Sequence, residues 1–555
     1  MKKGFSLKRC FRDWSVVEWL LLAFFIGVLV LNVLVVFQTS LHVLDSDTSS
    51  ELVLSKHLNE TGRIVSEDWF YSTDLQVLNV HLIFAPLFSL FSVWRHVRFF
   101  GVLILQGMLL LSYWYLCKAA KLNRKAYLLG GGLMLLPLSV AYGRIVLYNV
   151  HYIMHTIVSY LLIAFFLSLL RDLEEKRSKR SFALHLLALL LLSLGSGTNG
   201  IRQACMTHLP MLLVLAIVLV KPSLKSDPKP AWFWLCGALL ILSCVAFGIG
   251  YLINGELAKQ YTFANYGGSR IQLKSMDIVK DTLFGFLHMF GYRRGVLLVS
   301  AAGILSLLGL VAGAIVGGHC CMVLVGKEWE RPFAVRFLTL LFPCGIILYF
   351  LFLFIVSSVD WPTLYINMYF PLFFPMVGAL LTSPMPEKRN QLGSPQKIMA
   401  GFVAVVLLLN ALFNVLYFCN PKKYAQDYEG LGWWDIHTAS ELEPLRAHLV
   451  DNGYDVGYCS YWFGNILTEM SNGQLETVPI GLTKDEIYFY QWLTEKEQVD
   501  LVPQKPFVII ARDELPLFEA SEIFPHCDLM VEQIDYLAYE VDDPMLIYNY
   551  LHSDQ

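Results

Sequence analysis

Three carboxylates lie within seven residues, Asp45 to Glu51, directly after the first strongly apolar stretch of the chain. They are Asp45, Asp47 and Glu51. Oxygen ligands at alternate positions suit hard divalent cations, so Asp45 and Asp47 are the expected ligands if Mg²⁺ or Mn²⁺ is bound. Alternatively, one carboxylate is a general base for an acceptor hydroxyl while its neighbours raise its pKa. A third interpretation is solvated surface charge, which is usual for acidic residues in loops.

Four arginines are candidates for binding an anionic phosphate group. Arg144 and Arg202 lie in short segments between apolar stretches, and Arg293 and Arg294 directly precede another apolar stretch. Arginine can hold phosphate oxygens through two parallel hydrogen bonds, which makes these residues suitable for a sugar-phosphate leaving group. The competing interpretation is that they anchor the ends of membrane helices to lipid headgroups.

The segment 144–152 places several polar side chains at the start of an apolar stretch. Tyr148, Asn149 and His151 are the clearest examples. Polar residues at membrane depth usually face a cavity, so these three are candidates for lining a sugar pocket or orienting a base. An aromatic belt at the membrane interface explains the same pattern equally well.

The composition indicates which class of protein holds these residues in place. The chain has 555 residues, of which 56% are hydrophobic and 16% charged, and its mean hydropathy is +0.53. A typical soluble domain is about 25% charged. The sequence therefore predicts an integral membrane protein that contacts membrane lipids. It disfavours a soluble enzyme and a nucleic-acid-binding protein.

Eleven stretches are long and apolar enough, or nearly so, to cross a bilayer as helices of about 20 residues. They lie at 17–37, 98–117, 126–143, 152–170, 182–195, 206–220, 231–252, 296–318, 337–356, 364–382 and 399–418. The first is too long, and too poorly followed by a small-residue cleavage site, to be a removable signal peptide. The sequence thus predicts a polytopic α-helical protein with about eleven transmembrane helices.

Basic residues in the short connections set the expected orientation. With eleven spans, every basic cluster falls on one side, which must then be the cytoplasm. The clusters are 2–12, 118–125, 171–180, 221–229, 327–336 and 388–397. The N-terminus is therefore expected in the cytoplasm and residues 420–555 on the opposite side of a multi-pass inner (plasma) membrane protein.

The segment 79–97 is apolar enough to be a twelfth span, but counting it would place the 118–125 cluster outside the cytoplasm. Its Pro86 and its end at Trp94–His96 suit a membrane interface better than a bilayer centre. We interpret 79–97 as a helix on the outer surface of the membrane, at the end of a first outer loop over 38–97.

Residues 420–555 differ from the rest of the chain in charge and in pattern. They hold 25 of the 45 acidic residues but only 7 of the 42 basic ones. Helical and strand patterns alternate there. We predict helices at 438–452 and 461–472 and strands at 454–459, 475–480 and 506–510. The chain therefore divides into a transmembrane domain, 1–419, and an extracytoplasmic acidic α/β domain, 420–555.

The order of features in the first outer loop resembles that of the GT-C membrane glycosyltransferases. The acidic segment 44–51 is followed by Gly62, an aromatic-rich stretch at 69–71, and the interfacial segment with His81. This superfamily includes the protein O-mannosyltransferases and the aminoarabinose transferases. The resemblance covers the general plan of 1–419, and only 44–81 is specific enough to count as a motif.

The resemblance implies a bacterial cell-envelope hexosyltransferase. Its donor would be a sugar on a polyprenyl phosphate, its acceptor a glycan, lipid or protein at the outer face, and its catalytic base an acidic residue of the first outer loop, acting with inversion. The mannosyltransferase branch has adjacent Asp and Glu where this chain has Asp45–Ser46–Asp47, which leaves the base open between Asp45 and Asp47. We prefer Asp47, with Asp45 or Glu51 in support. The expected substrate-binding residues are His81, Arg144, Tyr148, Asn149, His151, Arg202, Arg293 and Arg294.

Two other classes of function fit parts of the sequence. A transporter or lipid flippase would also be polytopic, but such proteins commonly show repeated halves and charges at the membrane midplane, and we find neither here. A non-catalytic envelope assembly or sensor protein would use the acidic outer domain to bind another protein.

Overall fold

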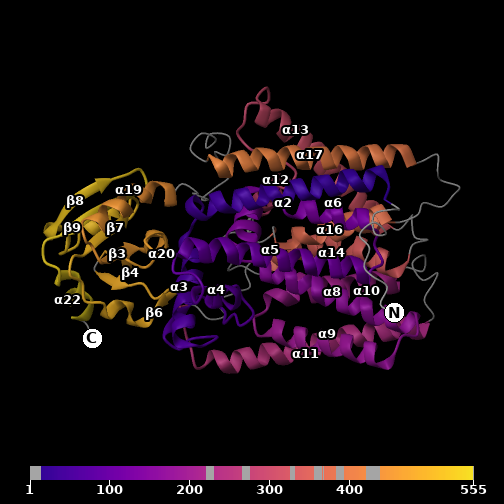
Figure 1. Ribbon diagram of the computed structural model, residues 1–555, viewed down its shortest axis with the longest axis horizontal. Helices are drawn as coiled ribbons and strands as arrows, with labels where there is room; N and C mark the ends of the chain where they lie inside the picture. Colours follow the sequence, from indigo (N-terminus) through magenta and orange to yellow (C-terminus); the bar gives the residue numbers. More distant parts are fainter. Residues whose placement is uncertain are drawn as a thin grey trace, which may run out of the picture.

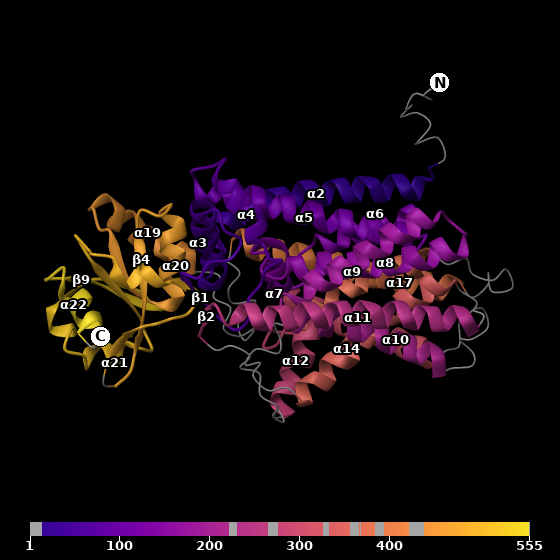
Figure 2. The same ribbon diagram turned by 90° about the horizontal axis from the view of Figure 1, so that it is seen from below.

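The computed structural model describes residues 14–220, 230–264, 276–325, 332–355, 366, 368–382, 393–420, 438–484 and 486–553. A long body of helices occupies most of the molecule, and a smaller domain built on a β-sheet lies at one end of it (Figures 1 and 2). The predicted combination of a polytopic helical region with a C-terminal α/β domain is confirmed.

Among the described residues, eight helices are long and apolar enough to cross a membrane. Each corresponds to one of the predicted spans, and most of them run side by side along the body (Figure 1). They are α2 (Val16–His42), α5 (Trp94–Ala119), α8 (Ile153–Glu174), α9 (Lys179–Gly197), α11 (Pro230–Ala258), α13 (Ala301–Val325), α14 (Phe333–Ile355) and α17 (Gly393–Cys419).

The other three predicted spans, 126–143, 206–220 and 364–382, consist of shorter elements. In the span 126–143 the helix is interrupted near Pro137. Proline disfavours helical geometry in the residue before it and has no N–H to donate a helical hydrogen bond. The elements are α6 (Arg124–Met134), α7 (Val140–Tyr142) and the π-helix η1 (Gly143–Tyr148); the π-helix η2 (Ala204–His208) with α10 (Leu209–Val220); and the 3₁₀-helix η4 (Phe370–Leu372) with α16 (Phe373–Thr382).

Two of the predicted basic clusters meet at one end of the helical body. The Arg171 Nη1 donates to the Lys118 carbonyl at 2.8 Å, and the Lys121 Nζ lies 2.6 Å from Glu175. The start of α2 is at the same end, since Arg124 lies over the Trp14 ring. The clusters 2–12 and 221–229, and parts of 327–336 and 388–397, lie outside the described residues.

At the opposite end, α2 is followed by α3 (Ser46–Thr61), which belongs to the first outer loop. Asp45 caps this helix by accepting a hydrogen bond from the Thr48 backbone N–H at 2.8 Å. Such caps satisfy backbone donors that a helix leaves unpaired. The helix ends at Gly62, whose φ of +65° is a conformation that glycine adopts without strain.

The predicted interfacial helix over 79–97 is shorter than expected. Helix α4 covers only His81–Phe88, and the residues from Trp94 onward belong to the long helix α5. Val93 between them is extended, which separates the two helices. With eight residues, about 12 Å of helix, α4 is too short to cross a bilayer. It packs against α3 and α5.

The C-terminal domain contains a six-stranded mixed sheet in the order β5-β4-β3-β7-β9-β8. The strands are β3 (Val456–Ser460), β4 (Glu476–Leu482), β5 (Ile487–Phe489), β7 (Phe507–Ala511), β8 (Cys527–Glu532) and β9 (Tyr536–Val541). The central strand β3 is parallel to both β4 and β7, and the outer pairings are antiparallel.

Helices cover both faces of this sheet with apolar side chains. Helices α19 (Thr438–Asp451) and α20 (Tyr461–Met470) lie on one face, and α21 (Leu515–Glu519) and α22 (Leu546–His552) on the other. The two helices and three strands predicted from the sequence are therefore confirmed, with boundaries shifted by at most two residues.

The C-terminal domain is joined to the first outer loop by a second, three-stranded sheet. In this sheet β1 (Trp69–Tyr71) lies between β2 (Thr262–Phe263) and β6 (Thr494–Glu495). Leu44, just before α3, is buried in the apolar core that α19 and α20 form with the large sheet. Helix α3 consequently lies between the helical body and the C-terminal domain (Figure 1).

The remaining described elements are short or peripheral. They are α12 (Met276–His288), η7 (Lys496–Asp500) and η8 (Phe524–His526).

Candidate active site

Asp45 is held by an arginine from a distant part of the chain. Its Oδ2 lies 2.7 Å from the Arg144 Nη2 and accepts a hydrogen bond from the Arg144 Nε at 2.9 Å, while the Asn149 Nδ2 lies 3.3 Å away. Burial opposes ionisation of Asp45, but Arg144 and the Thr48 N–H outweigh it and hold the pKa of Asp45 below its usual range. Asp45 is thus an ionised carboxylate that is held in place by its ion pair with Arg144.

Asp47, two residues later, has a different environment. Among the described residues its carboxylate accepts one hydrogen bond, from the Tyr461 hydroxyl to Oδ1 at 2.6 Å, and the residue stays partly exposed. Burial and the nearby charge of Asp45 raise the pKa of Asp47 above its usual range. A carboxylate with a raised pKa is a stronger proton acceptor, so Asp47 suits the role of general base better than Asp45.

Glu51, one turn further along α3, pairs with His151. The Glu51 Oε1 lies 2.6 Å from the His151 Nδ1, and both side chains are largely buried. Burial lowers the pKa of His151, but the carboxylate of Glu51 outweighs it, and the net shift is upward. The Glu51 Oε2 is buried without a hydrogen-bond partner in the described part of the chain. Such an atom costs free energy unless a bound molecule satisfies it.

Irregular backbone places Arg144, Asn149 and His151 at these carboxylates. Arg144 belongs to the π-helix η1, and Val150 has a φ of +58°, which strains a β-branched residue. Both features are most often found at functional sites, where surrounding contacts hold the strained conformation.

A buried ion pair lies beside the cluster. The Arg98 side chain of α5 binds Glu469 of α20 through two hydrogen bonds, one from Nη2 to Oε2 at 2.6 Å. Arg98 Nη2 also donates to the Thr48 carbonyl at 3.1 Å. The pair therefore connects the membrane helices, the start of α3 and the C-terminal domain.

Arg202 lies next to the same group of residues. Its Nη1 donates to the Tyr152 hydroxyl at 3.3 Å, and its Nε lies 3.8 Å from the Asp74 carboxylate. Its charge acts on His151, whose pKa it lowers. The Arg202 side chain is 23% exposed, and its guanidinium also lies over the Tyr152 ring.

Arg293 is placed in a different network. Its Nη2 donates to Asn410 and Asn414, each at 3.1 Å, and its Nη1 donates to the Gly291 carbonyl at 3.0 Å. These bonds tie the segment before α13 to α17. Arg294 is exposed, lies 2.9 Å from Asp281 and stacks over Phe284. In the described residues, no hydrogen bond or ion pair links either arginine to Asp45, Asp47 or Glu51.

Tyr148 and His81 are buried and likewise make no hydrogen bond to these carboxylates within the described residues. The Tyr148 ring packs edge-on against Phe418 of α17, with the ring centroids 5.0 Å apart. His81 begins α4, and burial lowers its pKa to about 4, which keeps it neutral. Both side chains support the packing around the cluster.

No group of three or more His, Cys, Asp or Glu side chains is placed to hold a metal ion in the part of the chain that the structure describes. Asp45, one of the two expected ligands, has one oxygen paired with Arg144 and the other bonded to Thr48. The described side chains around Asp47 therefore do not form a complete set of ligands for a metal ion.

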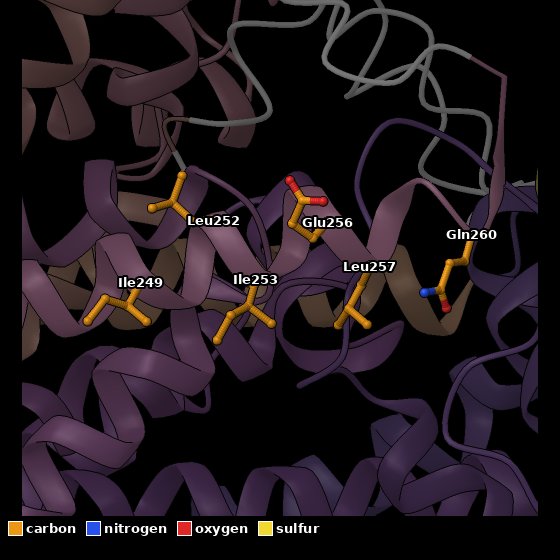
Figure 3. A pocket seen from close by; sticks show the side chains of 6 residues that line it. All are labelled: Ile249, Leu252, Ile253, Glu256, Leu257 and Gln260. Carbon is orange, nitrogen blue, oxygen red and sulfur yellow. The ribbon is translucent and has the colours of Figure 1, made fainter.

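Figure 3 shows a groove along the C-terminal half of α11. Four of its six side chains are apolar; five come from α11, and Gln260 follows directly after that helix. They are Ile249, Leu252, Ile253, Glu256, Leu257 and Gln260. The groove contains none of the predicted site residues.

Sequence reasoning missed three residues of this cluster: Arg98, Tyr461 and Glu469. Arg98 offered a weak signal, because an arginine in the first turn of a span usually has a specific contact. Nothing in the sequence around Tyr461 or Glu469 distinguishes them from other residues of an amphipathic helix.

No family model matches the chain, and no curated protein matches it in sequence. A solved structure does match in three dimensions: the crystal structure of ArnT from Cupriavidus metallidurans bound to undecaprenyl phosphate. The superposition covers 95% of this chain and 98% of that chain, with a TM-score of 0.50 and 14% sequence identity. ArnT is a GT-C aminoarabinose transferase, so the GT-C membrane fold expected from residues 44–81 is confirmed.

Proposed function

We propose that this protein transfers a sugar from a polyprenyl-phosphate donor to an acceptor at the outer face of the bacterial inner membrane. The main observation behind this proposal is Asp47, a carboxylate at the start of α3 that is partly exposed and has a raised pKa. The shared fold with a protein crystallised with undecaprenyl phosphate supports the donor class. The acceptor is a hydroxyl of a glycan, lipid or protein.

In the proposed reaction Asp47 accepts the proton of the acceptor hydroxyl. The acceptor oxygen forms a bond to the anomeric carbon as the bond from that carbon to the phosphate oxygen breaks, with inversion. Polyprenyl phosphate leaves with the electron pair of the broken bond. Asp45 stays ionised beside Arg144, and its charge raises the proton affinity of Asp47.

The leaving group gains negative charge as the bond breaks, so a cation must lie near it. Arg202 supports this role best among the four predicted arginines, because it lies near His151 and keeps an exposed edge. Arg144 is already paired with Asp45, and Arg293 is occupied by two asparagines. The site would face the outer side of the membrane, together with the C-terminal domain.

The test is a transfer assay with the purified chain in liposomes that contain undecaprenyl-phosphate-linked sugars, with release of undecaprenyl phosphate as the readout. We expect Asp47→Asn to lower kcat by about 10²–10⁴-fold, the usual contribution of a general base. Asp281→Asn is the matched control, because Asp281 is an exposed carboxylate far along the chain. Asp45→Asn is expected to lower activity as well.

Full activity in both Asp45→Asn and Asp47→Asn would contradict the proposal. Movement of the intact donor across the bilayer without release of undecaprenyl phosphate would favour a lipid flippase instead.

A further inference from the structure

A side chain of the C-terminal domain directly contacts the candidate active site. Tyr461, the first residue of α20, donates its hydroxyl to the Asp47 Oδ1 at 2.6 Å. Its ring is buried, with 7% of the residue exposed. The contact joins residues 414 positions apart in the sequence. A buried tyrosine hydroxyl that meets a single carboxylate oxygen fixes the direction in which that carboxylate points.

Further contacts show that this approach is part of a built interface. The Ser46 hydroxyl donates to the Tyr461 backbone carbonyl, and the Asn465 Nδ2 donates back to the Ser46 Oγ at 3.3 Å. Ser46 lies between Asp45 and Asp47 in the sequence, and its hydroxyl bonds to both Tyr461 and Asn465 of α20. The backbone and the side chain of Tyr461 are therefore both held against the start of α3.

Two more distant contacts keep the domain in this position. The buried Arg98–Glu469 pair joins α5 to the last turn of α20, and the Trp94 backbone N–H donates to the Asn472 side chain at 2.9 Å. Strand β6 pairs with β1 at the other edge of the interface. These contacts hold the C-terminal end of α20 against α5 and join the domain to the first outer loop.

We infer that Tyr461 is a positioning residue for the transfer reaction, and that the C-terminal domain thereby completes the active site. The inference rests on the proposed function of Asp47. With the Tyr461 hydroxyl on Oδ1, the carboxylate presents Oδ2 to the acceptor. The acceptor hydroxyl then meets an oxygen of fixed direction, which is the geometric requirement for efficient proton transfer.

The experiment compares Tyr461→Phe with Tyr458→Phe in the full chain, in the same liposome assay. Both substitutions remove one buried tyrosine hydroxyl from the same domain and leave the ring in place. Within the described residues the Tyr458 hydroxyl has no hydrogen-bond partner, whereas that of Tyr461 bonds to Asp47. Tyr458→Phe is therefore the matched control for a loss of the hydroxyl alone.

We expect Tyr461→Phe to lower kcat about 10- to 100-fold, because small errors in the position of a catalytic group cost about that much. The KM for the undecaprenyl-phosphate-linked sugar should stay within about twofold of wild type, since the donor does not bind through this hydroxyl. Tyr458→Phe should retain wild-type kcat. The two variants should unfold thermally at temperatures close to each other, which separates positioning from loss of structure.

Asp47→Asn, measured in parallel, separates this inference from the proposed function. If Asp47→Asn is inactive and Tyr461→Phe has wild-type kcat, the inference is overturned and the proposed base remains. If Asp47→Asn is active, the proposed base is wrong, and the inference fails with it. An equal loss of kcat in Tyr461→Phe and Tyr458→Phe would also overturn the inference, because it would show a general effect on the domain.

Discussion

Asp45 and Asp47 show how two identical side chains, two positions apart on the chain, acquire opposite properties. Asp45 faces Arg144 and the backbone N–H of Thr48, and its pKa is lowered. Burial and the charge of Asp45 raise the pKa of Asp47, although the hydrogen bond from Tyr461 acts in the opposite direction. Surroundings that push the pKa values of two neighbouring acids apart give them different roles. The structure therefore supports the preference for Asp47 with a physical reason.

Arg202 provides a test of where the phosphate binds. We expect Arg202→Gln to raise the KM for an undecaprenyl-phosphate-linked sugar about tenfold or more, because a charge-assisted bond to phosphate contributes about 1.5–3 kcal/mol. Arg202→Lys should restore only part of the loss, since lysine cannot form two parallel bonds. Steady-state kinetics in liposomes measure both effects.

Arg294→Gln is the control for that prediction, because Arg294 is exposed and pairs with Asp281. Its KM should equal that of wild type. If Arg294→Gln raised the KM and Arg202→Gln did not, the phosphate would bind near α12 instead.

At the scale of elements, the important arrangement is the contact between α3, α5 and α20. Helix α3 carries the carboxylates, α5 supplies Arg98, and α20 supplies Tyr461 and Glu469. The break in the predicted span 126–143 is equally important for the site, because Arg144 and Asn149 project from the irregular segment between α7 and α8. Uninterrupted helices would not turn both side chains toward Asp45.

The Arg98–Glu469 pair yields a prediction about this contact. Arg98→Met should destabilise the protein by about 3–5 kcal/mol, because it leaves the buried Glu469 charge unpaired. Glu469→Leu should do the same by leaving Arg98 unpaired. The double variant Arg98→Met/Glu469→Leu should be more stable than either single variant, since apolar side chains can replace a buried pair at little cost.

Thermal unfolding of the purified variants measures this coupling. If the loss of stability in the double variant equalled the sum of the losses in the two single variants, the two side chains would not stabilise the protein as a pair. The control is the ion pair between the exposed Glu443 and the partly exposed Arg446 of α19. Removing that pair should change stability by less than about 1 kcal/mol.

At the scale of the whole molecule, the helical body has two distinct ends. The connections carrying Lys118, Lys121 and Arg171 lie together at one end, and the acidic C-terminal domain lies at the other. The charge difference seen along the sequence is therefore a difference between two ends of the folded protein. Basic residues on short connections favour the cytoplasm.

Cysteine labelling in intact cells tests the proposed orientation. In a variant without native cysteines, Gln504→Cys in the C-terminal domain should react with a membrane-impermeant maleimide. Arg180→Cys in the first turn of α9 should react only after the membrane is opened. Both positions are exposed in the structure. The reverse labelling pattern would contradict the orientation and the proposed outer-face reaction.

The membrane class, the positions of the long helices and the main helices and strands of the C-terminal domain could all be predicted from the amino-acid sequence. Hydropathy and periodicity reveal these features because each is a property of neighbouring residues. The sequence also identified the acidic segment at 45–51, since three carboxylates next to a span stand out locally. It predicted Arg144, Asn149 and His151 as polar residues at membrane depth.

Which of these residues contact one another is seen only in the folded structure. The bond from Arg144 to Asp45 spans 99 positions, and the bond from Tyr461 to Asp47 spans 414. It also placed Arg293 against two asparagines, away from the acidic cluster. Such contacts depend on how whole helices pack, and no local pattern encodes them. The pKa difference between Asp45 and Asp47 follows from the same packing, because burial and neighbouring charges set it.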